Sequence, residues 1–145
     1  MAAIANKKLI GATNSNGSQI QRARYDFSVD GGVTGSLDIF EAEGAVLVKN
    51  FYAVVKTACA STGSMTLDVG VADAGGTTDA DYFNAAVAVA ALSGNVVLRP
   101  LMSTGTPDLF RLPLYLSASG KLTMAIAAAP LSGGVIEFVT EFTKA

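Results

Sequence analysis

The sequence predicts an all-β protein built as an antiparallel β-sandwich, and three observations support this. Several segments alternate apolar and polar residues with a period of two, as half-buried strands do. They recur at intervals of roughly 10–20 residues and are separated by Gly-rich turns such as Gly31-Gly32, Gly75-Gly76 and Gly133-Gly134. Hydrophobic residues make up 50% of the 145 residues and charged residues 15%, so disorder is excluded as the dominant state. The length fits one domain with a sizeable core.

Four strands are expected in the first half of the chain. In the long third strand, Lys49 and Asn50 interrupt the pattern and indicate an exposed edge, a bulge or a bend between sheets. The third and fourth strands are expected to form a hairpin-like unit. The four strands span residues 21–29, 36–40, 45–57 and 64–72, and their expected inward side chains include Ala23, Tyr25, Phe27, Val29, Leu37, Ile39, Met65, Leu67, Val69 and Val71.

The second half begins with a loop over residues 73–79, after which the sequence changes character. Ala is the best helix former, and Asp79 can cap a helix with Asp81 in its first turn. We therefore expect a short helix over residues 80–86. Further strands are expected at residues 96–98, 109–116, 121–128 and 135–143, the second of them at an edge or bulge because it contains Pro113.

The chain is expected to divide into an N-terminal arm, residues 1–19, and a sandwich domain, residues 20–145. The arm is mostly polar or small and cannot bury enough surface to order itself. Lys7 and Lys8 interrupt it before a signal-peptide core could form, and the longest apolar run, residues 85–92, is far below the roughly 20 residues of a membrane span. With one unpaired cysteine, these features favour synthesis in a reducing cytoplasm.

The composition argues against nucleic-acid binding and against catalysis. Ten basic residues face twelve acidic ones, and the chain has no His, the usual general base and metal ligand. The single cysteine, Cys59, is expected to be a small buried hydrophobe. We expect no catalytic residue, no cofactor and no metal, and the composition favours a protein that acts by packing or assembly.

Two sets of carboxylates are candidates for chemical sites. Glu41 with Glu43, and Glu137 with Glu141, have the even spacing of a solvated strand face, which is the simpler interpretation. The acidic segment carrying Asp68, Asp73, Asp79 and Asp81 could supply oxygen ligands to Ca²⁺, but its spacing matches no EF-hand, and a surface loop is the preferred interpretation.

Residues expected to contact a partner lie at the N-terminal end. Arg22 and Arg24 share the polar face of the first strand, where they could contact an acidic partner surface or simply form a local ion pair with Asp26. The arm carries apolar residues that need a partner surface. The expected partner-contact residues are Ile4, Lys7, Lys8, Leu9, Ile10, Arg22 and Arg24.

The order of the motifs resembles a known class of proteins. YDFSVDGGVTGSLDIFEAEGAVLVKNFYAVV is followed by STGSMTLDVGVAD, GGTTDADYFNAAVAVAAL and SGKLTMAIAAAPLSGGVIEFVTEF. Over about residues 20–143 this resembles decoration, or cement, proteins of tailed-bacteriophage heads. The resemblance implies a jelly-roll-like sandwich, often trimeric, on the capsid exterior of a virion. It also implies a major capsid protein as partner and no enzyme activity.

The composition is compatible with that expectation. A chain this apolar and weakly charged is expected to bury surface between copies, so we expect a homo-oligomer, most simply a trimer. The alternative is a receptor- or carbohydrate-binding β-sandwich module of a phage fibre or spike. The absence of Trp weakens this alternative, because sugar sites commonly use aromatic stacking.

Overall fold

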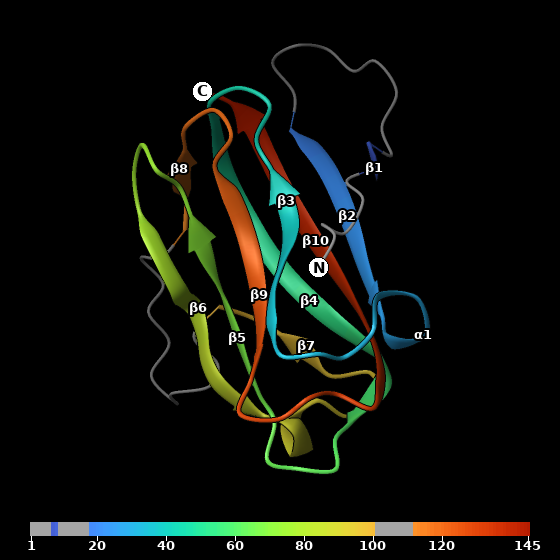
Figure 1. Cartoon of the computed structure of the whole chain (residues 1–145). Helices are drawn as coiled ribbons and strands as arrows, with labels where there is room; N and C mark the ends of the chain where they lie inside the picture. Colours follow the sequence, from blue (N-terminus) through green and yellow to red (C-terminus); the bar gives the residue numbers. More distant parts are fainter. Residues whose placement is uncertain (1–6, 9–17, 101–111) are drawn as a thin grey trace.

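The chain folds into two antiparallel β-sheets packed face to face, as a computed structural model describes for residues 7–8 (backbone), 18–100 and 112–145 (Figure 1). One sheet has the order β1-β2-β10-β4-β7, with β8 also paired to β4, and the other has the order β3-β9-β5-β6. The strands are β1 (Lys7–Lys8), β2 (Gln19–Asp26), β3 (Gly35–Glu41), β4 (Val46–Ala60), β5 (Thr66–Ala72), β6 (Thr78–Ala88), β7 (Val97–Leu98), β8 (Leu114–Leu116), β9 (Lys121–Ala127) and β10 (Gly133–Lys144).

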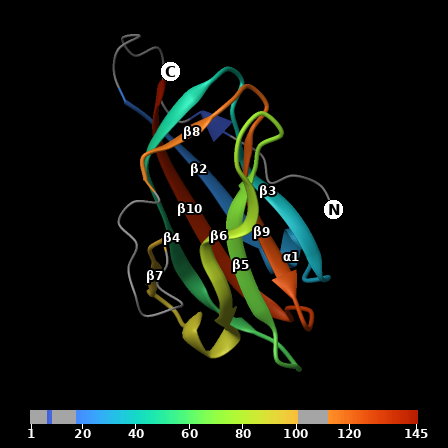
Figure 2. The same ribbon diagram turned by 90° about the vertical axis from the view of Figure 1, so that its left-hand side faces the viewer.

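This strand order is that of a jelly roll. Along the chain β2, β4, β7, β8 and β10 belong to one sheet, and β3, β5, β6 and β9 belong to the other, so most connections pass between the sheets. Figure 2 shows the two layers from the side. The order β2-β10-β4-β7 facing β3-β9-β5-β6 is the double Greek key of eight-stranded jelly rolls. The predicted all-β, jelly-roll-like sandwich is therefore confirmed.

The space between the sheets is filled by large apolar side chains. The ring of Phe51 lies 5.0 Å from that of Phe83 and 6.2 Å from that of Phe138, measured between centroids. The inward side chains predicted on residues 36–40 and 64–72 are buried: Leu37, Ile39, Met65, Leu67, Val69 and Val71. Local alternation was sufficient to predict these faces, because side chains on a strand alternate between its two sides.

The long strand β4 contains a bulge, one of the three alternatives expected at Lys49 and Asn50. Asn50 is paired with Glu141, but the next pair along β10 joins Phe142 to Val48. Lys49 is thus an extra residue in the ladder. The bulge lets Val48 and Phe51 both face the core although they are separated by an odd number of positions.

The expected hairpin of residues 45–57 with 64–72 is wrong. β4 pairs with β10, β7 and β8, whereas β5 pairs with β9 and β6 in the opposite sheet. The turn between β4 and β5 therefore carries the chain from one sheet to the other. Both strands have an apolar face, but β4 pairs with strands distant in sequence, whereas β5 pairs with its sequence neighbour β6 and with the distant β9. Short-range patterns do not specify this choice.

The expected helix over residues 80–86 is also wrong, because this segment belongs to β6. Its residues pair with β5, from Ala72 opposite Thr78 to Thr66 opposite Ala88, with two register shifts. Ala86 adopts a positive φ of 48°, which breaks the regular ladder. Strand pairing lets this segment bury Phe83 against the other sheet, and such tertiary packing outweighs the weak helix preference of Ala.

The first strand ends earlier than expected. β2 stops at Asp26, and a single helical turn, α1 (Phe27–Asp30), follows it. The inward positions Ala23 and Tyr25 are buried as predicted, but Val29 is 80% exposed. Hydrogen bonds to the carboxylates of Asp26 and Asp30 turn the chain out of the sheet at this point.

The remaining elements agree with the prediction where the structure describes them. β7, β9 and β10 begin and end within two residues of the expected bounds. β8 is shorter, and residues 109–111 of that expected strand lie outside the described residues. A short 3-10 turn, η1 (Val89–Ala91), follows β6. Within the described ranges no helix is long and apolar enough to cross a membrane.

Candidate functional site

The predicted partner-contact residues meet at one edge of the sheet, as far as the structure describes them. The backbone of Lys7 pairs with Arg22, and that of Lys8 with Gln21, so β1 extends the sheet beyond β2. Ile4, Leu9 and Ile10 lie outside the described residues. The division between arm and domain remains a prediction.

The two arginines on β2 form ion pairs at the surface. An Nη atom of Arg22 lies 3.2 Å from a carboxylate oxygen of Glu137 on β10. An Nη atom of Arg24 lies 3.9 Å from Asp26, the local pair considered from the sequence. Exposed pairs of this kind contribute little stability. Their role toward a partner stays a prediction.

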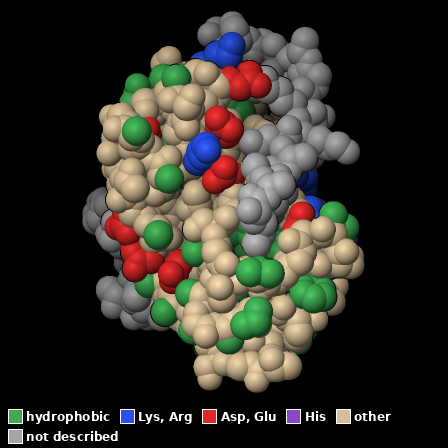
Figure 3. Space-filling view, viewed as in Figure 1, with side chains coloured by type: hydrophobic (Ala, Val, Ile, Leu, Met, Phe, Trp, Pro, Cys, Tyr) green, Lys and Arg blue, Asp and Glu red, His purple; other side chains and the backbone are tan. Residues whose placement is uncertain are grey.

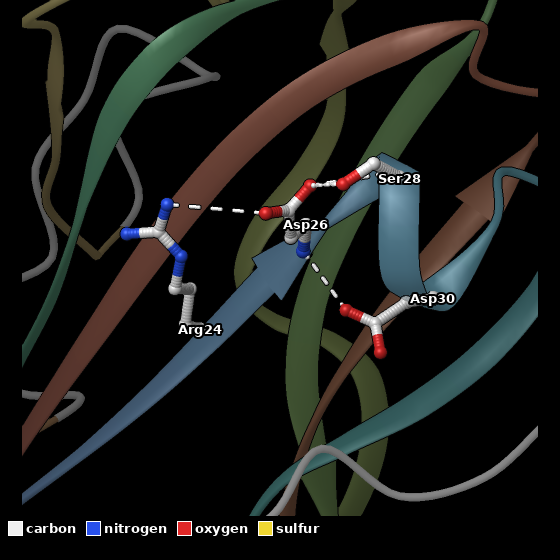
Figure 4. A network of polar contacts seen from close by, with 4 residues as sticks. All are labelled: Arg24, Asp26, Ser28 and Asp30. Carbon is white, nitrogen blue, oxygen red and sulfur yellow. Dashed lines mark hydrogen bonds and ion pairs between the residues drawn. The ribbon is translucent and has the colours of Figure 1, made fainter.

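A second feature, which sequence reasoning missed, is the projection formed by residues 26–33, here called the α1 tip. The carboxylate of Asp26 accepts hydrogen bonds from the backbone N–H of Ser28 at 3.0 Å and from its hydroxyl at 2.7 Å. The carboxylate of Asp30 accepts one from the backbone N–H of Asp26 at 2.8 Å (Figure 4). Asp26 thereby caps the helical turn, and the hydrogen bonds from Ser28 hold the pKa of its carboxyl below the usual value.

The far end of the tip is fixed by two glycines. Gly31 has a φ of 75°, a conformation that favours glycine, and its carbonyl accepts a hydrogen bond from the buried Tyr25 hydroxyl at 2.6 Å. Gly32 packs so closely on Leu131 that an added Cβ would lie 2.0 Å from the Leu131 carbonyl oxygen. The backbone N–H of Leu131 donates to the Gly32 carbonyl at 2.8 Å. The tip is thus tied to the core strand β2 and to the turn before β10.

The tip presents apolar side chains to solvent. Val29 and Val33 are 80% and 67% exposed, the highest values among the large hydrophobic residues that the structure describes. Figure 3 shows hydrophobic side chains gathering at the end of the sandwich where α1 lies. The sequence does contain a signal for this turn, namely Asp26 two residues before Ser28 and then Gly31-Gly32. The apolar–polar alternation of residues 21–29 masked it, because it predicts a continuous strand.

The acidic segment does not form one cluster. Asp73 is buried, and its carboxylate accepts hydrogen bonds from the backbone N–H of Gly75 at 3.1 Å and from Ser117. Asp68 accepts from the backbone N–H of Ala86 at 2.6 Å. Asp79 accepts from the N–H of Asp81 at 3.3 Å. Across residues 18–100 and 112–145, no three His, Cys, Asp or Glu side chains are grouped so that they could hold a metal ion.

Of the other candidate side chains, Cys59 is buried, Glu137 is ion-paired and Asp81 is hydrogen-bonded to Asp79. Cys59 is buried at the end of β4, as predicted, and this burial raises the pKa of its thiol to about 11. Glu137 is paired with Arg22. A hydrogen bond with Asp79, burial and the nearby charges of Asp79 and Asp68 raise the pKa of Asp81.

The chain is thus a jelly-roll sandwich with a hydrogen-bonded projection, the α1 tip, that presents apolar side chains to solvent. No family model and no curated protein sequence matches the chain. Its fold is similar to a chain in the structure "Capsid of Ralstonia phage GP4", with a TM-score of 0.59 and 17% identity over 94% of this chain and 91% of that one. It is also similar to a chain of "Cyanophage Pam1 capsid asymmetric unit", with a TM-score of 0.56 and 13% identity over 97% and 94%. At these identities the likeness is one of fold.

Proposed function

We propose that this chain is a structural protein of a tailed-phage virion and not an enzyme. The observation that carries the proposal is the jelly roll shared, over 94% or more of this chain, with chains of two phage capsid structures. Two further observations support the proposal. The sequence contains no His, and the carboxylates of Asp73 and Glu137 are occupied by a hydrogen bond from Ser117 and an ion pair with Arg22.

Within the virion, the proposed role is that of a decoration protein on the capsid exterior, made in the host cytoplasm. Its partners are other copies of itself and the major capsid protein. Two features support this role. The motif order resembles decoration proteins, and a chain with 50% hydrophobic and 15% charged residues gains from covering surface in an assembly.

The proposed assembly is a homotrimer, with the N-terminal arm and the arginine-bearing edge of β2 near the contact. Multi-angle light scattering at micromolar concentration tests it. A mass near three times 14.8 kDa supports the trimer, and a stable monomer contradicts it.

The decoration role is tested on phage particles in which the gene for this chain is deleted. We expect particles of normal diameter that release DNA at a lower temperature, with stability restored by the purified protein. A receptor- or carbohydrate-binding module would give the opposite result: unchanged particle stability with impaired adsorption to the host. That outcome would replace the proposal by the alternative.

A further inference from the structure

The α1 tip combines high exposure with firm attachment. Val29 and Val33 bury little in the isolated chain, while Phe27 between β2 and Val29 is partly buried against the core. Single exposed apolar residues are ordinary on protein surfaces. Two such residues on a short projection whose backbone is held at both ends by hydrogen bonds form a contact element that needs little further ordering when it binds.

The polar network explains why the tip can keep this shape without a partner. The carboxylates of Asp26 and Asp30 accept hydrogen bonds from the backbone N–H groups of Ser28 and Asp26 at the start of the turn (Figure 4). The N–H of Gly31 donates to the Phe27 carbonyl at 3.0 Å and closes its end. The conformation that presents Val29 is therefore set by local chemistry and not by the partner.

The charge of the tip indicates which partner it fits. Residues 26–33 contain two carboxylates, Asp26 and Asp30, and no basic residue. The adjacent Arg24 lies 3.9 Å from Asp26 and offsets one of them. Two tips of neighbouring copies placed together would bring carboxylates of like charge into contact, which is unfavourable. The tip therefore suits a surface with basic groups around an apolar depression.

A groove on a second copy of the same chain fits this description poorly. The groove between β2 and the turn after β3 is lined by apolar Phe40 and Phe142, but also by Glu41 and Glu43 against the single ammonium of Lys144. A lining that includes two glutamate side chains is not the basic surface that an acidic tip requires. These observations favour the shell protein over a second tip or this groove as the surface that receives the α1 tip.

We propose that the α1 tip docks into the capsid shell by inserting Val29 and Val33 into an apolar socket rimmed by Lys or Arg side chains of the shell protein. This rests on the proposed function, because the shell is the partner that function supplies. The apolar side chains provide affinity by leaving water. The carboxylates of Asp26 and Asp30 provide orientation and salt dependence.

The test measures binding of the purified protein to capsid shells that lack it, by co-sedimentation across a range of salt concentrations. The main variant is the double substitution Val29→Thr with Val33→Thr, which keeps the side-chain shape and removes apolar surface. We expect about tenfold weaker binding with an unchanged melting temperature, as loss of buried apolar surface at two positions predicts. Val29→Ile is the matched control and should bind like the wild type.

A second variant tests the electrostatic part. Asp30→Asn keeps an oxygen that can accept the hydrogen bond from the Asp26 N–H and removes the charge. We expect weaker binding at low salt and a shallower dependence on salt, with circular dichroism unchanged. Tyr115→Ser, at a 52% exposed residue of β8 outside the tip, should leave binding unchanged.

The outcomes separate the two proposals. Wild-type binding that the double Thr variant retains in full overturns the docking role of the tip and leaves the decoration role intact. Failure of the wild type to bind any shell overturns the decoration role and the docking role together. A change in oligomer mass for the double Thr variant with shell binding intact shows that the tip contacts another copy, which also overturns the proposal.

Discussion

The buried carboxylate of Asp73 joins two loops that are 44 residues apart, because it accepts hydrogen bonds from both the backbone N–H (2.9 Å) and the hydroxyl of Ser117. Asp73 follows β5, and Ser117 follows β8 in the opposite sheet. The same carboxylate holds the N–H of Gly75, so it also shapes the turn between β5 and β6. This residue is therefore a structural link between the sheets at one end of the jelly roll.

Removal of that link should destabilise the fold. Asp73→Ala leaves the N–H groups of Ser117 and Gly75 without their acceptor, and we expect a loss of about 1–3 kcal/mol in the free energy of unfolding. Ser117→Ala removes only the hydroxyl donor and should cost about 1 kcal/mol. Urea denaturation measures both, and equal stability of Asp73→Ala and the wild type would show that the link contributes nothing.

The same residue should make stability depend on pH in the acid range. Burial opposes ionisation of Asp73, but the hydrogen bonds from Ser117 and Gly75 outweigh it and lower the pKa of the carboxyl. A lowered native pKa stabilises the fold above the unfolded value of about 3.9, and this contribution is lost as the pH falls below it. The stability difference between wild type and Asp73→Asn should therefore shrink below about pH 4. A difference that stays constant down to pH 2 would contradict this assignment.

The close approach of β5 and β6 should make Gly70 intolerant of a side chain. A Cβ there would lie 2.2 Å from the carbonyl oxygen of Asp79 and 2.3 Å from the backbone of Ala80. We expect Gly70→Ala to destabilise the protein by about 1–3 kcal/mol, because the β6 backbone must move. Gly44→Ala is the control, since its Cβ would meet no atom within 4 Å, and it should be neutral or slightly stabilising. Equal effects of the two substitutions would argue against the observed packing of β6.

The thiol of Cys59 should report unfolding. Its pKa of about 11 leaves about one thiol in a thousand ionised at pH 8, and the side chain is buried. A thiol reagent should therefore label the native protein slowly and label it rapidly once urea has unfolded it. Fast stoichiometric labelling of the native protein would contradict the burial of Cys59.

The arm prediction is tested by deleting residues 2–18. The sandwich begins with β2 at Gln19, and only the short β1 is lost from the described part of the sheets, so we expect a folded domain by circular dichroism. If the arm binds a neighbouring copy or the capsid, the truncated protein should lose its oligomeric state or its affinity for shells. Unchanged assembly and unchanged affinity would show that the arm is dispensable.

The sequence by itself determined the all-β class and the inward faces of several strands. Leu37 and Ile39 were correctly assigned to the core, as were Leu67 and Val69, because the two-residue period of a strand is a local property. The interruption at Lys49 was visible for the same reason. Cys59 was predictable as a buried hydrophobe at the end of an apolar segment.

Only the tertiary structure decided which strands pair and which local preference prevails. The segment containing Phe83 became strand β6 because pairing with β5 buries its aromatic ring, which no helix propensity measures. The link from Asp73 to Ser117 joins loops that are far apart in sequence, and it appears only once both sheets are in place. The exposure of Val29 has a local cause instead, because the cap made by Asp26 competed with strand alternation and prevailed. In each case the deciding interaction lay outside the repeating pattern from which the prediction was made.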